Sequence, residues 1–266
     1  MLEMLRTRRC LFSRPFGLQL WSVLFWAALS PCSGAEPRTF SVGVEDYPNF
    51  LPYSSCVKGQ YSGLGRDILD AFAHERGYVF RYEVYPLKRR DRLFVEGRLD
   101  FSFPDNPNWV ADLKKKVSIA YAPMLEFTDG VLLNASDRGK GVAHLKVLGI
   151  PLGFTPYPYQ QLMMAGALRV EESQQYDALY EQLIMRRVDG AYMNTRIARH
   201  YWSRLHPDRK TALVYDANLP HASGYWYLSS IKYSSIIDEF KRYLAAHRQD
   251  VDELKKRYGF DAAEDE

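Results

Sequence analysis

The sequence predicts a two-lobed α/β fold in which two βαβαβ units are joined by a hinge of two chain segments. Strand-like and helix-like stretches alternate over residues 40–103, and the same order returns over residues 146–193. Such alternation favours a mostly parallel sheet covered by helices. The 266 residues suffice for two units, because domains commonly contain about 100 to 150 residues.

The elements of the first unit are predicted from hydrophobic periodicity and from the glycines that end its helices. Apolar residues at every second position indicate a strand, and apolar residues at helical spacing indicate a helix. Gly77 and Gly97 follow the two helical stretches, as expected of residues that end a helix. The patterns predict strands at residues 40–44, 80–84 and 99–103, and helices at residues 64–74 and 86–96.

The second unit repeats this order. Its patterns predict strands at residues 146–150 and 188–193, and helices at residues 159–168 and 176–184. The junction Glu-Gly-Arg-Leu-Asp-Phe at residues 96–101 has an echo in Met-Arg-Arg-Val-Asp-Gly at residues 185–190, which indicates that the two lobes are similar.

The predicted hinge follows from the extended residues 131–133 and 213–215, which flank the second unit as the two chain crossings. We therefore assign residues 36–130 and 216–266 to lobe 1, and residues 131–215 to lobe 2. A strand at residues 225–228 and helices near residues 236–247 and 251–258 return the chain to lobe 1. The strand ends of both lobes then face one cleft, the usual place for a ligand in such folds.

The first 35 residues are predicted to be a cleaved signal peptide. Four arginines between residues 6 and 14 precede an apolar run over residues 16–29, and small residues follow up to Ala35. This order is typical of an export signal, and we place cleavage after Ala35. The apolar run is shorter than the roughly 20 residues that a membrane-spanning helix needs. The sequence therefore predicts export to the periplasm.

Two other interpretations of the leader remain open. Residues 7–12, Thr-Arg-Arg-Cys-Leu-Phe, suggest a twin-arginine export route, and Cys32 suggests lipidation. Pro31, just before Cys32, argues against lipidation.

Charge and cysteine content exclude several classes of function. The leader carries four Arg and one Glu, so its removal lowers the formal charge from +3 to zero. A neutral mature chain gives no reason to expect nucleic acid as a partner, and residues 114–116, three lysines, are expected to be a solvated helix face. Cys56 is the one cysteine of the mature chain, and the histidines lack metal-binding spacing. We therefore expect neither a metal nor a cofactor.

Short motifs, in their order and spacing, link the mature chain to a known family. They are residues 40–44 followed by Tyr47-Pro48, residues 62–69 and 97–100, and in the tail residues 240–244 and 255–260. Together they resemble the bacterial extracellular solute-binding proteins of family 3, the amino-acid-binding type associated with ABC importers. The resemblance covers essentially the whole mature chain, which is similar to a divergent member. It implies a type II periplasmic binding protein-like fold, whose lobes close by hinge motion.

The resemblance also implies which residues line the cleft. These proteins use an aromatic residue after the first strand, polar groups after the strand that follows the Gly-x-x-Asp motif, and a helix start in lobe 2. The equivalent residues here are Tyr47 and Phe50, then Asp105 and Asn106, then Thr155. A Thr hydroxyl at a helix start suits a carboxylate or another anion, and it suits an ordinary N-cap equally well.

Three further aromatic residues have two open interpretations each. Trp109 can cover a planar part of the ligand or pack inside a lobe. Tyr157 can contact the ligand or cover lobe 2, and core packing is expected for Tyr159.

Three departures from the family pattern bear on the ligand. Leu113 stands near the place of the Arg that grips an α-carboxylate in a Thr-x-x-Arg element. Asn194 replaces the Asp that pairs with the α-ammonium group. Arg89 and Arg90 begin the helix at residues 86–96, as in a branch with a Pro-x-x-Arg element, where the macrodipole opposes a cation. Either can contact an anion in the cleft or be a solvated surface residue. The sequence thus predicts a small polar or anionic solute rather than a standard α-amino acid held at both ends.

The function expected from these observations is solute binding without catalysis, by a soluble monomer that serves an inner-membrane permease of the ABC type. One alternative is an accessory or sensory periplasmic protein that kept the fold without transport. Another is a periplasmic lyase or dehydratase on the same scaffold. That chemistry needs a cleft carboxylate with a raised pKa, for which Glu45, Asp46 and Asp105 are the candidates.

Overall fold

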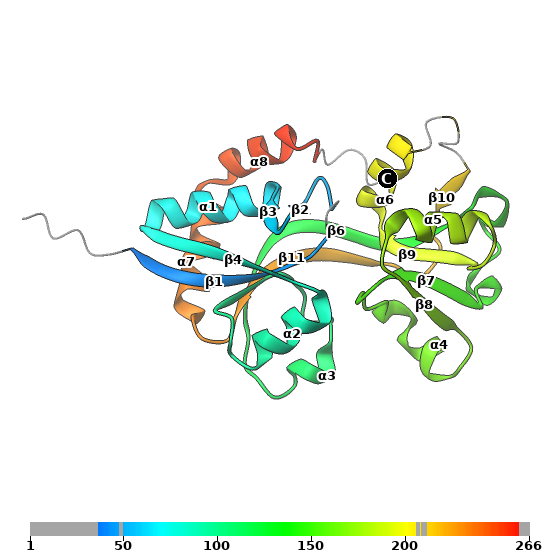
Figure 1. The fold of residues 1–266 in the computed structure, drawn as a ribbon, viewed down its shortest axis with the longest axis horizontal. Helices are drawn as coiled ribbons and strands as arrows, with labels where there is room; N and C mark the ends of the chain where they lie inside the picture. The colour runs from blue at the N-terminus through cyan, green and yellow to red at the C-terminus, as the bar shows by residue number, and fades with distance from the viewer. Residues whose placement is uncertain (1–36, 48–49, 206–207, 209–211, 261–266) are drawn as a thin grey trace, which may run out of the picture. The chain divides into compact units, whose positions relative to one another are not determined.

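A computed structural model describes residues 37–47, 50–205, 208 and 212–260. The predicted signal peptide, residues 1–35, lies outside the described residues. The chain from Pro37 onward forms one compact unit, in which helices cover a curled mixed sheet (Figure 1).

Lobe 1 is built on three parallel strands with β1 in the centre. The alternating residues Phe40, Val42 and Val44 of β1 are all buried, as the sequence predicts. The first helix ends at Gly77, whose φ of 67° lies in the left-handed region that glycine adopts without strain. The elements are β1 (Arg38–Glu45), α1 (Leu64–Arg76), β4 (Tyr78–Tyr85), α2 (Leu87–Val95) and β5 (Phe101–Asp105).

Lobe 2 repeats this arrangement with β7 in the centre of three parallel strands. Its elements are β7 (Val147–Pro151), the 3-10 turn η3 (Tyr157–Tyr159), α4 (Gln160–Met164), β8 (Arg169–Ser173), α5 (Tyr176–Ile184), β9 (Gly190–Asn194) and α6 (Thr195–Leu205). The predicted helix over residues 159–168 is shorter in the structure. It ends before Gly166, which has a φ of 69°, and the chain then enters β8.

The two lobes are structural repeats. The strand order β4-β1-β5 in lobe 1 matches β8-β7-β9 in lobe 2, in each case second, first and third along the chain. The similar segments at residues 96–101 and 185–190 have the same structural role in the two lobes. Asp100 accepts a hydrogen bond from the backbone N–H of Ser41 in β1 (2.9 Å), and Asp189 accepts one from Val147 in β7 (2.8 Å). Each Asp therefore joins the start of its third strand to the first strand.

Two long antiparallel strands connect the lobes. β6 (Ala120–Asn134) pairs with β11 (Ala222–Ser230) up to Asp129, and from Asp129 onward it pairs with β9. β10 (Leu213–Tyr215) pairs with the end of β6. β6 and β11 run side by side between the lobes in Figure 1. Hydrogen bonding between strands is thus continuous through both lobes, because β6 belongs to both.

The remaining elements extend these two units. They are the hairpin β2 (Ser55–Val57) and β3 (Gln60–Ser62), the short helix α3 (Ala111–Lys114), the 3-10 turns η1 (Ala135–Asp137) and η2 (Val142–His144), and the helices α7 (Ser234–Ala246) and α8 (Arg248–Arg257). α7 packs on β6 and β11, and α8 packs on α1 and α7, so both C-terminal helices lie against elements from the first part of the chain.

The main hydrophobic core lies between the sheet and its covering helices and includes residues of both lobes. A second core fills lobe 2 around β7, with Val131, Leu148 and Tyr192 fully buried. Tyr159 is also completely buried there, which agrees with the core position expected for it. Both cores leave the carboxyl ends of the parallel strands directed toward the junction of the lobes.

Candidate functional site

A small cavity lies where the carboxyl ends of the strands of both lobes meet. Its volume in this closed arrangement is about 30 Å³, room for only a few water molecules. Its wall comes from the end of β1, from α2, from the loops after β5 and β7, and from β6 and β11. The lining residues are Glu45, Tyr47, Phe50, Leu87, Arg90, Asp91, Pro104, Trp109, Asp129, Gly153, Phe154, Thr155 and Trp226.

Aromatic rings form much of this wall. Phe50 stacks on Tyr47 with the ring centroids 5.2 Å apart, and on Trp226 at 5.5 Å. Phe154 of lobe 2 contacts the edge of both Tyr47 (6.1 Å) and Phe50 (6.3 Å). Trp109 meets Trp226 at 6.4 Å. A planar or apolar group entering the cavity would therefore contact ring faces from both lobes.

Glu45, the last residue of β1, is buried in this wall with only 1% of its surface exposed. Its Oε1 accepts a hydrogen bond of 2.6 Å from the Ser54 hydroxyl, while its Oε2 has no hydrogen-bond partner among the described residues. Burial raises the pKa of Glu45 to about 7, although Ser54 and Arg90 act in the opposite direction. The group can therefore exchange a proton near neutral pH.

Arg90 is the one cationic side chain among the described residues of the wall. It is 1% exposed, and its Nε and Nη2 donate to Oδ1 of Asp91 at 3.0 and 2.6 Å. Burial lowers the pKa of Arg90, but the charges of Asp91, Asp105 and Glu45 outweigh this effect and raise it. Its Nη1 has no hydrogen-bond partner within the described parts of the chain.

Asp129 reaches the cavity from the middle of β6, at the crossing between the lobes. It is 3% exposed, and its Oδ1 accepts a hydrogen bond of 3.3 Å from the Asn194 side-chain amide. Burial raises the pKa of Asp129 to about 7, and the bond from Asn194 lowers it. Asn194 also accepts a hydrogen bond from the backbone N–H of Ile197 (3.1 Å) at the start of α6. Asn194 thus positions a carboxylate instead of lining the cavity.

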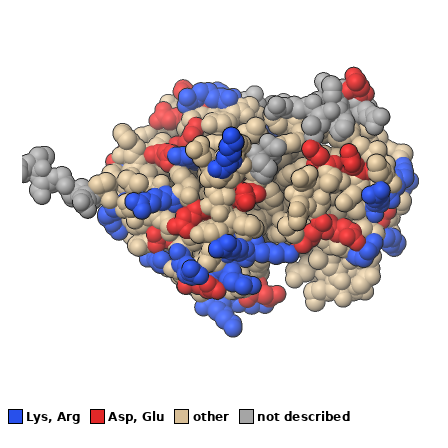
Figure 2. Space-filling view, viewed as in Figure 1, with Lys and Arg blue, Asp and Glu red and all other residues tan. Residues whose placement is uncertain are grey.

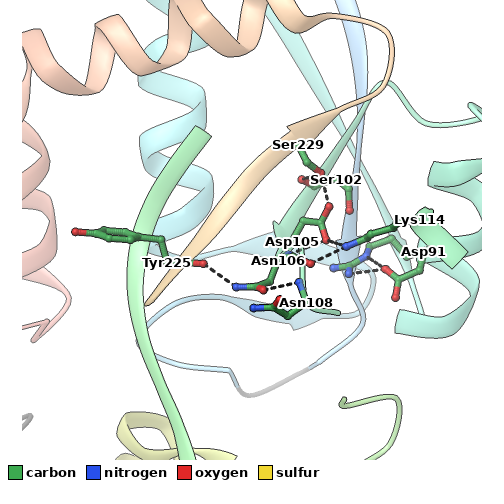
Figure 3. A network of polar contacts seen from close by, with 9 residues as sticks. Asp91, Ser102, Asp105, Asn106, Asn108, Lys114, Tyr225 and Ser229 are labelled. Atoms are coloured by element: carbon green, nitrogen blue, oxygen red, sulfur yellow. Dashed lines mark hydrogen bonds and ion pairs between the residues drawn. The ribbon is translucent and has the colours of Figure 1, made fainter. Parts of the chain in front are cut away.

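Asp105 and Asn106, at the end of β5, belong to a polar network beside the cavity (Figure 3). Asp105 accepts hydrogen bonds from Ser229 Oγ (2.6 Å) and from Lys114 Nζ, which also donates to the Asn106 carbonyl (2.8 Å). The Asn106 side chain donates to the Tyr225 carbonyl at 3.2 Å.

The expectation that the three lysines at 114–116 form a solvated face is wrong for Lys114. It is 7% exposed, because it is the cationic partner of the buried Asp105. This pair also fixes the loop that carries Trp109 into the cavity wall.

The structure brings together half of the ten residues predicted to bind the ligand. Tyr47, Phe50, Arg90, Trp109 and Thr155 line the cavity. Thr155 is not a helix N-cap: η3 begins after Pro156, and α4 begins after Tyr159.

The other five lie outside the wall. Arg89 is exposed, with its guanidinium over the Tyr85 ring at 5.0 Å, and Tyr157 is half-buried at the start of η3. Asp105, Asn106 and Asn194 lie behind the wall in the networks described above. Whether any of the ten contacts a ligand stays a prediction.

Sequence reasoning did not predict Asp91, Asp129, Phe154 and Trp226 as lining residues, and it named Glu45 only for an enzyme. The local signal for Asp91 was its place next to Arg90. Asp129 and Trp226 carry no such signal, because they lie inside strands whose partners are distant in sequence.

Two polar contacts join the lobes beside the cavity. The Tyr47 hydroxyl donates to the Leu152 carbonyl at 2.6 Å, and Lys88 forms an ion pair of 2.9 Å with Glu172. Figure 2 shows Lys and Arg side chains gathered over α2 next to Asp and Glu side chains over β8. Because the cavity holds only about 30 Å³, a solute larger than a few water molecules needs the lobes to separate, and such a movement would break these contacts.

Two further tests concern metals and membranes. No group of three His, Cys, Asp or Glu side chains within the described ranges could hold a metal ion. Among the described helices, none is both long and apolar enough to cross a bilayer.

Comparison with known proteins finds similarity in structure. No family model matches the chain, and no curated protein matches it. The chain is similar to an ancestral arginine-binding protein bound to arginine, with 16% identity and a TM-score of 0.64 over 84% of this chain and 99% of that one. It is similar to an arginine 3rd transport system periplasmic binding protein from Legionella pneumophila, with 15% identity and a TM-score of 0.64 over 83% and 99%.

A third similar structure is the ancestral amino acid-binding protein AncCDT-1, a precursor of cyclohexadienyl dehydratase. The identity is 17% and the TM-score 0.61, over 83% of this chain and 94% of that one. At such identities the similarity establishes the fold, and the predicted fold class is confirmed. The chain has the two-lobed, type II periplasmic binding protein-like α/β fold.

Proposed function

We propose that the chain is a periplasmic solute-binding protein, which captures a small polar molecule between its lobes and delivers it to an inner-membrane permease of the ABC type. The observation that carries this proposal is the cavity at the carboxyl ends of the strands, with walls from both lobes and polar contacts that join the lobes beside it. A hinge with such a cavity suits capture by closure.

The similar structures support the same proposal, since they include proteins described as arginine-binding and as part of a transport system. They also support a periplasmic location. The proposal includes cleavage after Ala35, a monomeric mature chain, and lobes formed by residues 36–130 with 216–266 and by residues 131–215.

The test is whether the protein retains and binds a small molecule. Native mass spectrometry of protein purified without denaturation should reveal a bound solute, and that solute should raise the melting temperature of protein from which it was removed. Trp109→Ala should weaken its binding, whereas Tyr225→Ala, which changes an exposed aromatic residue outside the wall, should not. Absence of a retained solute, together with no thermal shift from amino acids, amines or carboxylates, would refute solute binding.

A second candidate function, a lyase or dehydratase, is favoured by one observation. Glu45 lies in the cavity with a pKa of about 7, which suits a residue that accepts and donates a proton near neutral pH. The dehydratase precursor among the similar structures agrees with this alternative. Incorporation of deuterium from deuterated water into the bound solute would support catalysis if it is fast with the native chain and lost in Glu45→Gln. Release of the solute unchanged and unlabelled would support binding alone.

A further inference from the structure

The cavity wall carries more negative than positive charge. Its residues that can be charged near neutral pH are three carboxyl groups and one guanidinium, and the Arg90 guanidinium is already paired with Asp91 through two hydrogen bonds. Glu45 and Asp129 remain. Neither forms an ion pair with a Lys or Arg side chain that the structure describes. Buried carboxyl groups normally have such a partner, because an uncompensated buried charge is costly.

The same wall contains three buried polar atoms without a hydrogen-bond partner among the described residues. They are Glu45 Oε2, Arg90 Nη1 and Trp226 Nε1, on side chains that are at most 2% exposed. Most buried polar groups in proteins are hydrogen-bonded, so a cluster of exceptions around one cavity needs an explanation. A bound molecule that supplies both a donor and an acceptor would satisfy all three.

Building on the solute-binding function proposed above, we infer that the solute carries a net positive charge, which the carboxylates of Glu45 and Asp129 compensate. An acceptor atom of the same solute accepts hydrogen bonds from the N–H groups of Arg90 Nη1 and Trp226 Nε1. Its planar or apolar part lies against the rings of Tyr47, Phe50 and Phe154.

Electrostatics favours a cation over the other solute classes. An anion would meet Arg90, but Asp91 already balances that charge, and Glu45 and Asp129 would repel it. A neutral solute, or a zwitterion without further charge, would leave the net negative charge of the ionised Glu45 and Asp129 uncompensated, because its own charges sum to zero. Aromatic rings also attract cations through their faces, so the wall formed by Tyr47, Phe50 and Trp226 adds to the preference.

Binding of a cation should release protons. The pKa values of Glu45 and Asp129 are both raised to about 7, so each group is about half protonated at pH 7, and a cation beside them lowers both values. The charged and titratable groups that interact with Glu45 are Arg90, Tyr47, Tyr61, Tyr176 and the Cys56 thiol, and those that interact with Asp129 are Tyr157, Tyr176 and Tyr192. The pKa of each of these tyrosines is raised, so none of them competes as an anion near pH 7.

The experiment compares solutes that have one shape and different charge. L-arginine is paired with L-citrulline, in which a neutral urea replaces the guanidinium group, and tyramine is paired with 4-hydroxyphenylacetate. Thermal shift and isothermal titration calorimetry are recorded at pH 8 for all four, and for any solute that native mass spectrometry identifies. We expect the cationic member of at least one pair to bind more tightly than its partner. Calorimetry in two buffers at pH 7 should show proton release for that cation.

Variants then test the two carboxylates. Glu45→Gln and Asp129→Asn keep the oxygen atoms that accept hydrogen bonds from Ser54 and Asn194, so the local structure should persist. Each substitution should lower the affinity for the cationic solute by about 10- to 100-fold. Glu126→Gln, the same change at a half-exposed residue outside the wall that pairs with Lys255, should leave the affinity unchanged.

The outcomes separate this inference from the proposed function. Tighter binding by the neutral or anionic member of both pairs, a retained solute without positive charge, or cation binding that Glu45→Gln and Asp129→Asn leave intact overturns the inference and leaves solute binding in place. Failure of every solute to bind, with none retained, overturns both.

Discussion

At the scale of single residues, Glu45 and Asp129 hold carboxyl groups where their surroundings oppose a negative charge. Burial raises the pKa of Glu45 from 4.5 and that of Asp129 from 3.8, both to about 7. The folded chain therefore binds these protons more tightly than the unfolded chain. The stability that this provides is complete below about pH 4, declines as the pH rises toward 7, and is absent above 7.

Glu45→Gln should accordingly stabilise the protein, and only at high pH. A pKa shift from 4.5 to about 7 corresponds to roughly 3 kcal/mol in the free energy of unfolding. We expect a gain of that order at pH 8 and almost none at pH 4, measured by urea denaturation. Glu126→Gln, at a half-exposed residue, is the control and should change little at either pH. A loss of stability in Glu45→Gln at pH 8 would mean that the ionised carboxylate has a favourable partner in the folded chain.

The sequence allowed only some residues of the cavity to be predicted, for reasons that depend on locality. Tyr47 and Phe50 come shortly after β1, where the resemblance to the solute-binding proteins implies an aromatic residue in the cleft. Asp129 and Trp226 lie within strands, and they reach the cavity only because β6 pairs with β11 and β9. Lys114 is buried because Asp105, nine residues earlier, needs a cation, whereas three consecutive lysines indicate a solvated face.

At the scale of elements, α3 and the loop before it depend on Lys114. Replacing it by Met leaves Asp105, 1% exposed, without its cationic partner, which should destabilise the fold by about 3 to 5 kcal/mol. Lys115→Met is the matched control, because Lys115 pairs with the exposed Asp112, and its effect should stay within about 0.5 kcal/mol. Both are measured by urea denaturation.

The double variant separates lost charge pairing from lost packing. If the unpaired charge causes the damage, Lys114→Met combined with Asp105→Asn should recover much of the stability. Equal stability of Lys114→Met and Lys115→Met would show that the pair contributes nothing to the loop.

Most elements were predictable because their periodicity is local, and those that were not depend on the chain elsewhere. β1, α1, β4, α2 and α5 have clear patterns, and Gly77 and Gly97 mark the ends of α1 and α2. Only residues 131–133 of β6 were predicted as extended, because the earlier part of this strand mixes Pro123, Glu126 and Asp129 with apolar residues. β8, Arg-Val-Glu-Glu-Ser, is too polar to indicate a strand, and it forms by parallel pairing with β7.

At the scale of the whole molecule, the repeat predicted from two short segments extends to strand order and to equivalent aspartates, Asp100 and Asp189. The division into residues 36–130 with 216–266 and residues 131–215 stays a prediction. β6 carries hydrogen bonds through both lobes and changes partner at Asp129. Movement of the lobes must therefore occur as bending or twisting of β6 and β11, without loss of their pairing.

Opening of the cavity is the last prediction and follows from its size. About 30 Å³ is far below the roughly 300 Å³ or more of a typical small-molecule site, so a solute enters only when the lobes separate. The Lys88–Glu172 pair favours the closed arrangement, and Lys88→Glu would place two carboxylates together beside the cavity. We expect a larger radius of gyration by small-angle X-ray scattering for this variant. We also expect its affinity for the solute to fall in proportion to the fraction of closed molecules. Higher salt should reduce both differences. The control is Lys241→Glu beside Asp238, an exposed ion pair within α7, which should change neither the radius of gyration nor the affinity. If the Lys88→Glu variant is as compact as the native chain and binds the solute as tightly, the Lys88–Glu172 pair does not control closure.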